Sequence, residues 1–313
     1  MRVTALVGLA LVAAAILAAT ASARRAAAIL TCDGVWTDRA RAREVPVRLR
    51  MPEGRSRVPV ILFSHGLGDD LRSGARWAEA WARDGFAVLN LQHAGSDRSI
   101  IGSGRIGAAM TPAQLRARVE DVRFAIDELE RRRSEGRCDL GRLDLSRIGM
   151  AGHSYGAHTT QAVAGQRFRA GRAGALREPR IDAAVALSPS PPFRGSSKEA
   201  FAEVTIPFLS ITGTEDRVPF LPRITPESRT EPFRAMPPGG KYLLVLDGAN
   251  HMTFGGHLEP VRRGPPPDAR HLSAVVEAST QFWRWTLKGD GGARRSLDSF
   301  ATRLGPGDRF ERR

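Results

Sequence analysis

The stretch AGHSYGAH, residues 151–158, decides the fold. It has the form Gly-x-Ser-x-Gly, with Ser154 between Gly152 and Gly156. The residues before it, RIGMAG, have the pattern of a buried strand, and those after the serine have the pattern of a short helix. At so sharp a strand-to-helix turn the serine backbone is strained. The helix also passes so close to the strand that the residues two positions before and after the serine, Gly152 and Gly156, must be glycine. The pattern therefore predicts an exposed serine hydroxyl at the end of a buried strand.

Other apolar runs predict the rest of a mostly parallel sheet. Five of them lack a polar face, which is typical of strands that helices cover on both sides: residues 58–64, 86–92, 181–188, 206–213 and 242–248. The segment VPVRLRM (45–51) instead alternates apolar residues with arginines. This alternation predicts a half-buried strand near an edge, with residues 35–38 as its antiparallel partner.

Helical patterns separate several of these strands. The clearest begins at Thr111, an N-cap that is followed by Pro112 and by Gln114 of a capping box. Its apolar stripe continues at helical spacing to Leu129. Two further helices are expected over residues 73–85 and 268–289. Strands that alternate with helices predict an α/β fold with a mostly parallel central sheet.

The first residues predict a secretory signal peptide. Arg2 precedes an apolar run that ends at Ala21-Ser22-Ala23, a small-x-small cleavage pattern. We expect cleavage of residues 1–23 and export to the periplasm or the medium; the alternative is an uncleaved membrane anchor. No other segment could span a bilayer, so no stable membrane insertion is expected after cleavage. The mature chain is expected to be one α/β domain, 24–295, with a C-terminal tail, 296–313.

Composition is consistent with one large globular domain and argues against a nucleic-acid partner. The chain has 313 residues, of which 42% are hydrophobic. Its formal net charge is +14, but the basic residues are interleaved with Asp and Glu and no DNA- or RNA-binding motif accompanies them. We therefore expect a solvated basic surface. The sequence does not indicate an oligomeric state.

Two cysteines, Cys32 and Cys138, remain after the expected cleavage. An oxidising compartment permits a disulfide between them, but two cysteines cannot make a disulfide-dense fold. From the sequence the bridge stays an open question.

At this point the chain resembles the α/β-hydrolase superfamily. The motifs FSHGLGDD (63–70), QHAGSD (92–97) and GHSYGAH (152–158) are similar to an exported bacterial branch near the dienelactone hydrolases and the platelet-activating-factor acetylhydrolases. The resemblance covers about residues 35 to 288. It implies an α/β-hydrolase fold, with a mostly parallel central sheet flanked by helices and antiparallel strands at its N-terminal edge. The short segment 189–205 leaves no room for a large lid.

A serine nucleophile needs a base, and the base needs an acid to orient it. In this fold the order along the chain is Ser, acid, His. His251, just after the last predicted strand, is the expected base, with His257 and His271 as the alternatives. Asp216 in GTED matches the family's Gly-Thr-x-Asp pattern and is the expected acid, with Glu215 as its competitor.

An acyl-transfer site also needs two donors for the oxyanion. The backbone N–H of Tyr155, at the start of the helix after the serine, is one expected donor. By resemblance the other is the N–H of Leu67 in HGLG, where His65 is expected to shape the loop. His93 could line the pocket or brace its loop, and we favour bracing.

These residues predict an exported serine hydrolase that cleaves small carboxylic esters of short acyl chains through an acyl-enzyme. The alternatives are an acyltransferase or a polyester or lipid hydrolase with the same triad, and, from another class, a non-catalytic binding protein on a hydrolase scaffold. No cofactor or metal is expected, because no His/Cys/Asp cluster has zinc spacing and no G-x-G-x-x-G directly follows a strand.

Overall fold

The computed structural model describes residues 28–104, 106–168, 176–259 and 267–313. The expected signal peptide, residues 1–23, lies outside these ranges. Within them the chain forms a nine-stranded sheet in the order β1-β2-β4-β3-β7-β8-β9-β10-β11. Neighbouring strands from β4 to β10 run parallel. The pairs β1-β2, β2-β4 and β10-β11 are antiparallel. The protein therefore has an α/β fold with a large, mostly parallel sheet, as expected.

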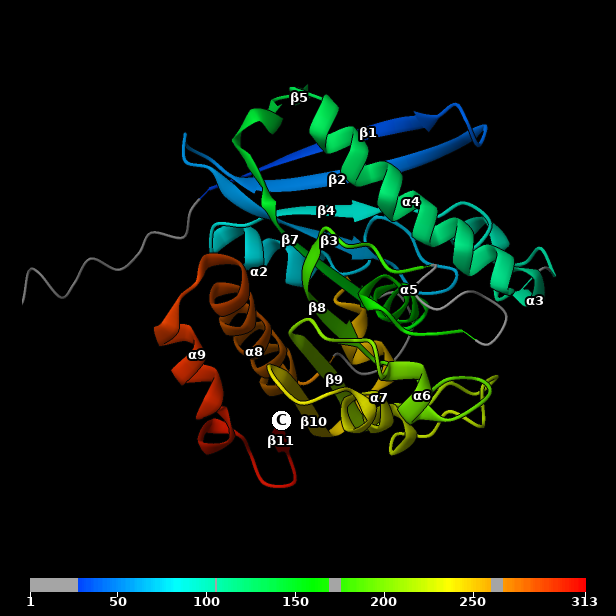
Figure 1. Ribbon diagram of the computed structural model, residues 1–313, viewed down its shortest axis with the longest axis vertical. Helices are drawn as coiled ribbons and strands as arrows, with labels where there is room; N and C mark the ends of the chain where they lie inside the picture. The colour runs from blue at the N-terminus through cyan, green and yellow to red at the C-terminus, as the bar shows by residue number, and fades with distance from the viewer. Residues whose placement is uncertain (1–27, 105, 169–175, 260–266) are drawn as a thin grey trace, which may run out of the picture.

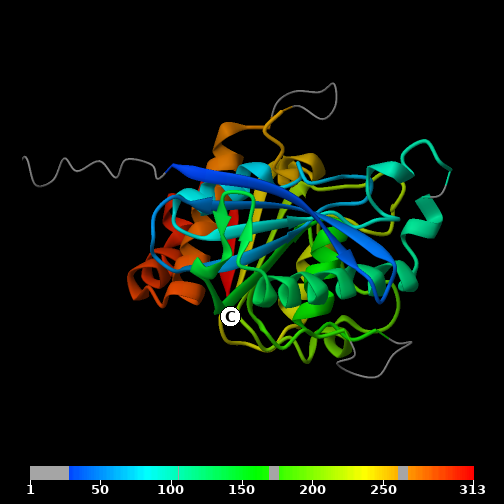
Figure 2. The same ribbon diagram turned by 90° about the horizontal axis from the view of Figure 1, so that it is seen from above.

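The strands follow the apolar runs of the sequence. All seven residues of the central strand β3 are buried, as are all five of β4. The strands of the large sheet are β1 (Ile29–Asp38), β2 (Arg43–Pro52), β3 (Val58–Ser64), β4 (Ala87–Leu91), β7 (Leu143–His153), β8 (Ile181–Leu187), β9 (Phe208–Glu215), β10 (Lys241–Asn250) and β11 (Arg309–Arg312). Figure 2 shows how the sheet twists between its blue N-terminal strands and its yellow to red C-terminal strands.

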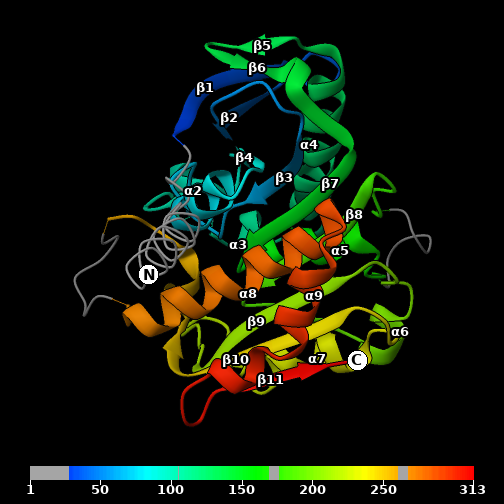
Figure 3. The ribbon, with the colours of Figure 1, turned by 90° about the vertical axis from the view of Figure 1, so that its left-hand side faces the viewer.

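Helices cover both faces of the sheet (Figures 1 and 3). On one face lie α2 (Ala75–Arg83), α8 (Ala269–Lys288) and α9 (Gly291–Asp298). On the other lie α4 (Pro112–Arg131), α5 (Tyr155–Ala164), α6 (Ser197–Phe201) and α7 (Glu231–Ala235), and the short α3 (Ile106–Ala109) precedes α4. The first layer is rich in aromatic rings: Trp81 of α2 and Trp283 of α8 meet edge to face with centroids 5.8 Å apart.

The helix α4 begins where the sequence places it, but only half of its capping box forms. Thr111 Oγ1 accepts a hydrogen bond from the Gln114 N–H at 3.3 Å. The Gln114 side chain does not reach back to the N-cap; its Nε2 donates to the Ala94 carbonyl at 2.8 Å. The reason is tertiary, because the QHAGSD loop passes the start of α4 and its Ala94 carbonyl binds the Gln114 Nε2, which turns the side chain away from the N-cap.

The N-terminal edge is an antiparallel pair, as expected, but β2 is more buried than its sequence suggests. The expected alternation is present in the first half of the strand and is lost in the second. Arg50 is only 5% exposed and donates to Asn90 Oδ1 at 3.1 Å. The polar face that we expected at this position is therefore covered, on the side of the sheet where α2 lies.

The sheet ends in a strand from within residues 296–313, the segment that we expected to be a tail. The short strand β11 pairs with β10, with Phe310 opposite Leu244. The Phe310 ring packs against Tyr242 and Phe300, with centroids 5.8 and 5.2 Å away. The backbone of the last residue, Arg313, exchanges hydrogen bonds with Lys241. One aromatic side chain and one row of backbone bonds thus hold the C-terminus against the sheet.

Cys32 and Cys138 form a disulfide, which answers the question that the sequence left open. Cys32 lies on the edge strand β1, and Cys138 belongs to a small hairpin of β5 (Ser134–Glu135) and β6 (Cys138–Asp139). The Trp36 indole N–H donates to the Glu135 carboxylate at 2.6 Å beside the bridge. The edge strand is therefore tied to the segment between α4 and β7.

Among the described residues, no helix combines the length and the apolar character that a membrane span requires.

The bridge closes a loop of 106 residues. Its removal in a Cys32→Ala/Cys138→Ala variant should lower the free energy of unfolding by about 4 kcal/mol in the chain-entropy account. Urea unfolding of the variant against the wild type measures this loss. Thiol titration of the denatured, unreduced wild type should detect no free thiol, and two titratable thiols would contradict the bridge.

Candidate active site

The turn at Ser154 has the strained geometry that its sequence predicts. Ser154 directly follows β7 with φ 55° and ψ −114°, which is rare for any residue with a side chain. A Cβ built at Gly156 would collide with the carbonyl oxygen of Ser64, and one built at Gly152 with the carbonyl oxygen of Gly156. The two glycines are thus required because α5 passes β7 and the end of β3 at backbone contact. The partly exposed Ser154 hydroxyl points out of this turn toward His251.

Ser154, His251 and Asp216 form one continuous chain of hydrogen bonds. His251 Nε2 lies 2.9 Å from Ser154 Oγ, and His251 Nδ1 lies 2.7 Å from Asp216 Oδ1. The three residues directly follow β7, β10 and β9, so they meet at the carboxyl edge of the parallel strands. With the Nδ1 proton donated to the carboxylate, Nε2 is the acceptor that a serine hydroxyl needs.

The competing residues are not part of this chain of hydrogen bonds. Glu215 is exposed at the end of β9, whereas Asp216 is fully buried. His257 Nε2 lies 2.9 Å from Asp69 Oδ2, and His271 Nε2 donates to the Asp247 carbonyl at 2.8 Å. The structure therefore brings together Ser154, Asp216 and His251 and leaves the alternatives apart.

Asp216 is held as a carboxylate by its neighbours. Burial by itself raises the pKa of Asp216, but the hydrogen bond with His251 and the nearby charge of Arg229 outweigh it and bring this pKa below its ordinary value. Thr212 Oγ1 donates to Asp216 Oδ2 at 2.8 Å, and Arg229 Nε lies 3.0 Å from Oδ1. Both carboxylate oxygens are thus paired, so Asp216 keeps a fixed orientation toward the imidazole.

Sequence reasoning missed Arg229. Its side chain is 1% exposed, and it donates to the backbone carbonyls of Asp216, Ser188 and Pro189. It therefore joins the loop after β8 to the loop after β9. Nothing local marks it among the many arginines of the chain. The only available signal was that a buried acid next to a histidine requires some cation or donor to balance it.

His153, which precedes Ser154, packs against His251. Its Nε2 donates to the His251 carbonyl at 3.0 Å, and the two rings lie 4.7 Å apart. Burial lowers the pKa of His153 to about 3. The ring is therefore neutral at ordinary pH and adds no second positive charge beside His251.

The two expected oxyanion donors have backbone N–H groups without a hydrogen-bond partner among the described residues. Tyr155 N is the first amide of α5, and Leu67 N lies in the loop after β3. Gly66 brings that loop to the nucleophile, because a Cβ built on it would lie 3.5 Å from Ser154 Cβ. Both free amides therefore belong to segments that meet at Ser154.

His65 orients the Leu67 amide through the preceding peptide. Its Nε2 accepts from the His93 N–H at 2.9 Å, which leaves Nδ1 to donate to the Gly66 carbonyl at 2.6 Å. Burial lowers the pKa of His65 to about 3, so this neutral tautomer persists. Because a trans peptide points its C=O and N–H in opposite directions, the bond to Gly66 also sets the direction of the Leu67 N–H.

His93 has the bracing role of the two that we considered. It is fully buried, with Nε2 2.7 Å from Ser64 Oγ and Nδ1 2.9 Å from Asp121 Oδ2. Burial lowers its pKa to about 4. This second Ser-His-Asp arrangement has no exposed surface, so no substrate can reach it, and it serves to hold the loops together.

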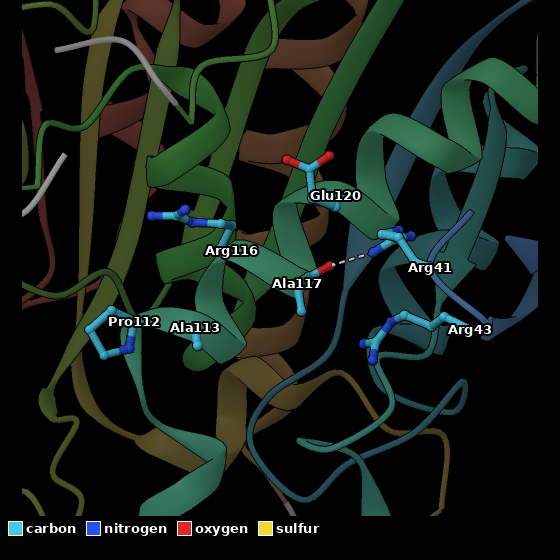
Figure 4. Close-up of a pocket in the computed structure, with 7 residues that line it drawn as sticks. All are labelled: Arg41, Arg43, Pro112, Ala113, Arg116, Ala117 and Glu120. Carbon is cyan, nitrogen blue, oxygen red and sulfur yellow. Dashed lines mark hydrogen bonds between the residues drawn. The ribbon is translucent and has the colours of Figure 1, made fainter. Parts of the chain in front are cut away.

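A cavity of about 610 Å³ lies between the β1–β2 turn and the start of α4, away from Ser154, Asp216 and His251 (Figure 4). Arg41 and Arg43 line one side and Arg116 and Glu120 the other, and Arg41 donates to the Ala117 carbonyl. It contains none of the residues that surround Ser154.

In the described part of the chain, no three His, Cys, Asp or Glu side chains gather as metal ligands would.

No protein-family model matches the chain, and no curated protein matches it.

Proposed function

We propose that this protein is an α/β-hydrolase that cleaves carboxylic esters through an acyl-enzyme on Ser154. The observation that carries the proposal is the hydrogen-bonded chain from Ser154 through His251 to Asp216. Its support comes from the strained turn at the serine, the mostly parallel sheet and the order Ser, Asp, His along the sequence. A scaffold without catalytic function would not require all of these together.

In the proposed reaction Ser154 Oγ attacks the ester carbonyl carbon while His251 Nε2 takes the hydroxyl proton. The tetrahedral intermediate collapses, and His251 gives this proton to the leaving alcohol. A water molecule then attacks the acyl-enzyme by the same route and releases the acid. Asp216 stays ionised throughout, orients the imidazole and stabilises its charged form.

The oxyanion of both tetrahedral intermediates would accept from the N–H groups of Tyr155 and Leu67. A preorganised donor stabilises charge that is present only in the transition state, and one such donor is worth about 10²- to 10³-fold in kcat. The positive end of the α5 dipole adds to the effect of the Tyr155 amide. We assign no metal or cofactor to this reaction, because the side chains and amides supply every proton and charge that it needs.

The cover over Ser154 suits short acyl groups. Between β8 and β9 the chain has only the loop 188–207, with one short helix, and no large lid. Of its two phenylalanines, Phe201 is fully buried in the core and Phe193 is exposed, at 59%. A long acyl chain would therefore stay largely in water, and each exposed CH₂ forfeits about 0.8 kcal/mol of binding.

One observation favours a lipid or polyester hydrolase as the second candidate. Apart from Val35 on β1, the large apolar side chains that are exposed among the described residues belong to segments that follow the carboxyl ends of parallel strands: Ile101, Ile106, Phe193, Phe220, Met252 and Leu258. Such side chains at the active edge could contact an apolar surface. The triad would be the same, so the two candidates differ in their substrate and are separated by acyl length.

Export is part of the proposal. The bridge between Cys32 and Cys138 suits an oxidising compartment, which the expected signal peptide would provide. The mature enzyme would then act on small esters in the periplasm or outside the cell.

Replacement of the nucleophile or the base tests the proposed mechanism directly. Ser154→Ala and His251→Ala should each lower kcat for nitrophenyl acetate by about 10⁴-fold or more, because triad members act as a unit. Thermal unfolding should barely change in either variant. A Ser154→Ala protein that still hydrolyses the ester would show that the turnover occurs elsewhere.

Substitution of two adjacent carboxylates by amides tests which of them is the acid. Asp216→Asn should lower kcat by about 10³- to 10⁴-fold, because an amide favours the wrong imidazole tautomer. Glu215→Gln is the matched control, since Glu215 is exposed and is not part of the chain of hydrogen bonds from Ser154 to Asp216. The kcat of this variant should stay within about twofold of the wild type. The reverse ranking would make Glu215 the acid.

Acyl length separates the two candidate functions. With a series of nitrophenyl esters, kcat/KM should be highest from acetyl to butyryl and should already have fallen at octanoyl, because the cover cannot enclose a longer chain. Activity that rises steadily to palmitoyl would favour the lipid hydrolase instead.

A further inference from the structure

Arg118, in the middle of α4, is a fully buried cation in contact with several loops. Its guanidinium donates to Thr159 Oγ1 at 2.9 Å, to Ser96 Oγ at 2.9 Å, to Ser64 Oγ at 3.1 Å and to the His65 carbonyl. Burial of an arginine is costly unless its donors are paired. So costly a group in the core needs a reason beyond packing, and its partners suggest one.

Two of these partners, His65 and Ser96, fix the backbone before and after the Leu67 amide. The His65 carbonyl, two residues before Leu67, accepts directly from Arg118. One residue after Leu67, the Gly68 N–H donates to the Ser96 carbonyl at 2.9 Å, and the Ser96 hydroxyl accepts from Arg118. The guanidinium therefore holds the loop that presents the Leu67 N–H directly at one end and through Ser96 at the other.

The same guanidinium also holds Tyr155, the other oxyanion donor. Its central carbon lies 4.5 Å from the centre of the Tyr155 ring, a cation–π contact. The Thr159 hydroxyl that accepts from Arg118 donates in turn to the Tyr155 carbonyl at 3.1 Å. Arg118 thus contacts the first turn of α5 through the side chain of Tyr155 and, by way of Thr159, through its backbone.

The charge and position of Arg118 are supported by the neighbouring turn of α4. Asp121 binds Arg43 and His93, and His93 holds the Ser64 hydroxyl that Arg118 also contacts. Burial lowers the pKa of Arg118 to about 10, so the guanidinium is still charged at neutral pH. Ser64 is the shared point of this cluster: its hydroxyl lies between His93 and Arg118, and its carbonyl lies against Gly156.

We propose that Arg118 is a positioning residue that sets the spacing between the Leu67 and Tyr155 amides, and so assembles the oxyanion hole without touching the substrate. The inference rests on the proposed ester hydrolysis. It requires that loss of Arg118 damages the stabilisation of the oxyanion more than ground-state binding or the triad. The effect must therefore appear in kcat, and it must depend on the atom that becomes the oxyanion.

The experiment compares an oxygen ester with the matching thionoester, in which sulfur replaces the carbonyl oxygen. Sulfur is larger and accepts hydrogen bonds weakly, so the thionoester gains little from the two amides. In Arg118→Lys, kcat for the ester should fall by about 10- to 100-fold, less than the 10²- to 10³-fold that outright loss of an oxyanion donor costs, because the amides are displaced and not removed. KM and the acid limb of the pH profile should be nearly unchanged, and the ester-to-thionoester ratio of kcat/KM should fall with kcat.

Arg142→Lys is the matched control. Arg142 is also a buried arginine that donates to carbonyl groups, those of Pro52 and Ser56, but it lies at the other end of the sheet. Its variant should lose stability without a change in the ester-to-thionoester ratio. A second test variant, Thr159→Val, removes one acceptor of Arg118 and leaves the buried charge in place, so it decides the question if Arg118→Lys does not fold.

The outcomes distinguish a failure of the positioning role of Arg118 from a failure of the proposed ester hydrolysis. If the ratio in Arg118→Lys or Thr159→Val stays at the wild-type value, as in Arg142→Lys, the positioning role is wrong while the hydrolase stands. If the wild type hydrolyses no ester, or only as well as Ser154→Ala, the proposed function fails and the positioning role fails with it.

Discussion

The close approach of α5 to the end of β3 is the constraint on which the site depends. At Gly156 the helix backbone meets the carbonyl of Ser64, with no side chain between them. Ser154 lies at the start of this helix, and the Leu67 loop begins immediately after Ser64. Ser154 and the loop beside it are therefore joined by backbone contact, which is more rigid than contact through flexible side chains. The buried cluster around Ser64 stabilises the same junction from the opposite side.

The parts of this architecture that are local in sequence could be predicted from it. The strand over residues 58–64 matches β3 exactly because helices cover both of its faces, and the two glycines around Ser154 follow from a steric rule. Asp216 and His251 were predicted with the help of a family order, since residues that directly follow parallel strands converge at one edge. Their alternatives, Glu215 and His257, could be separated only by burial and orientation, which a sequence does not contain.

The parts that depend on distant contacts could not be predicted. Arg229 and Arg118 look like any other of the 47 basic residues, and their partners lie up to 54 positions away along the chain. The strand β11 has only four residues, too few for a periodic signal, and Gln114 turned to a loop that no pattern placed nearby. In each case tertiary contacts outweighed local preference. For Arg118 and Arg229 these contacts lie at the candidate active site itself.

The pairing of β11 with β10 has a consequence for the order in which the sheet is completed. β10 ends at the residue before His251, and among the described residues β11 and Arg313 cover its outer edge. During synthesis this edge stays unpaired until β11 has been made, so the strand that carries His251 at its end gains its outer neighbour after the other strands of the sheet have been made. Loss of β11 would leave an open strand, the form in which sheets join those of other molecules.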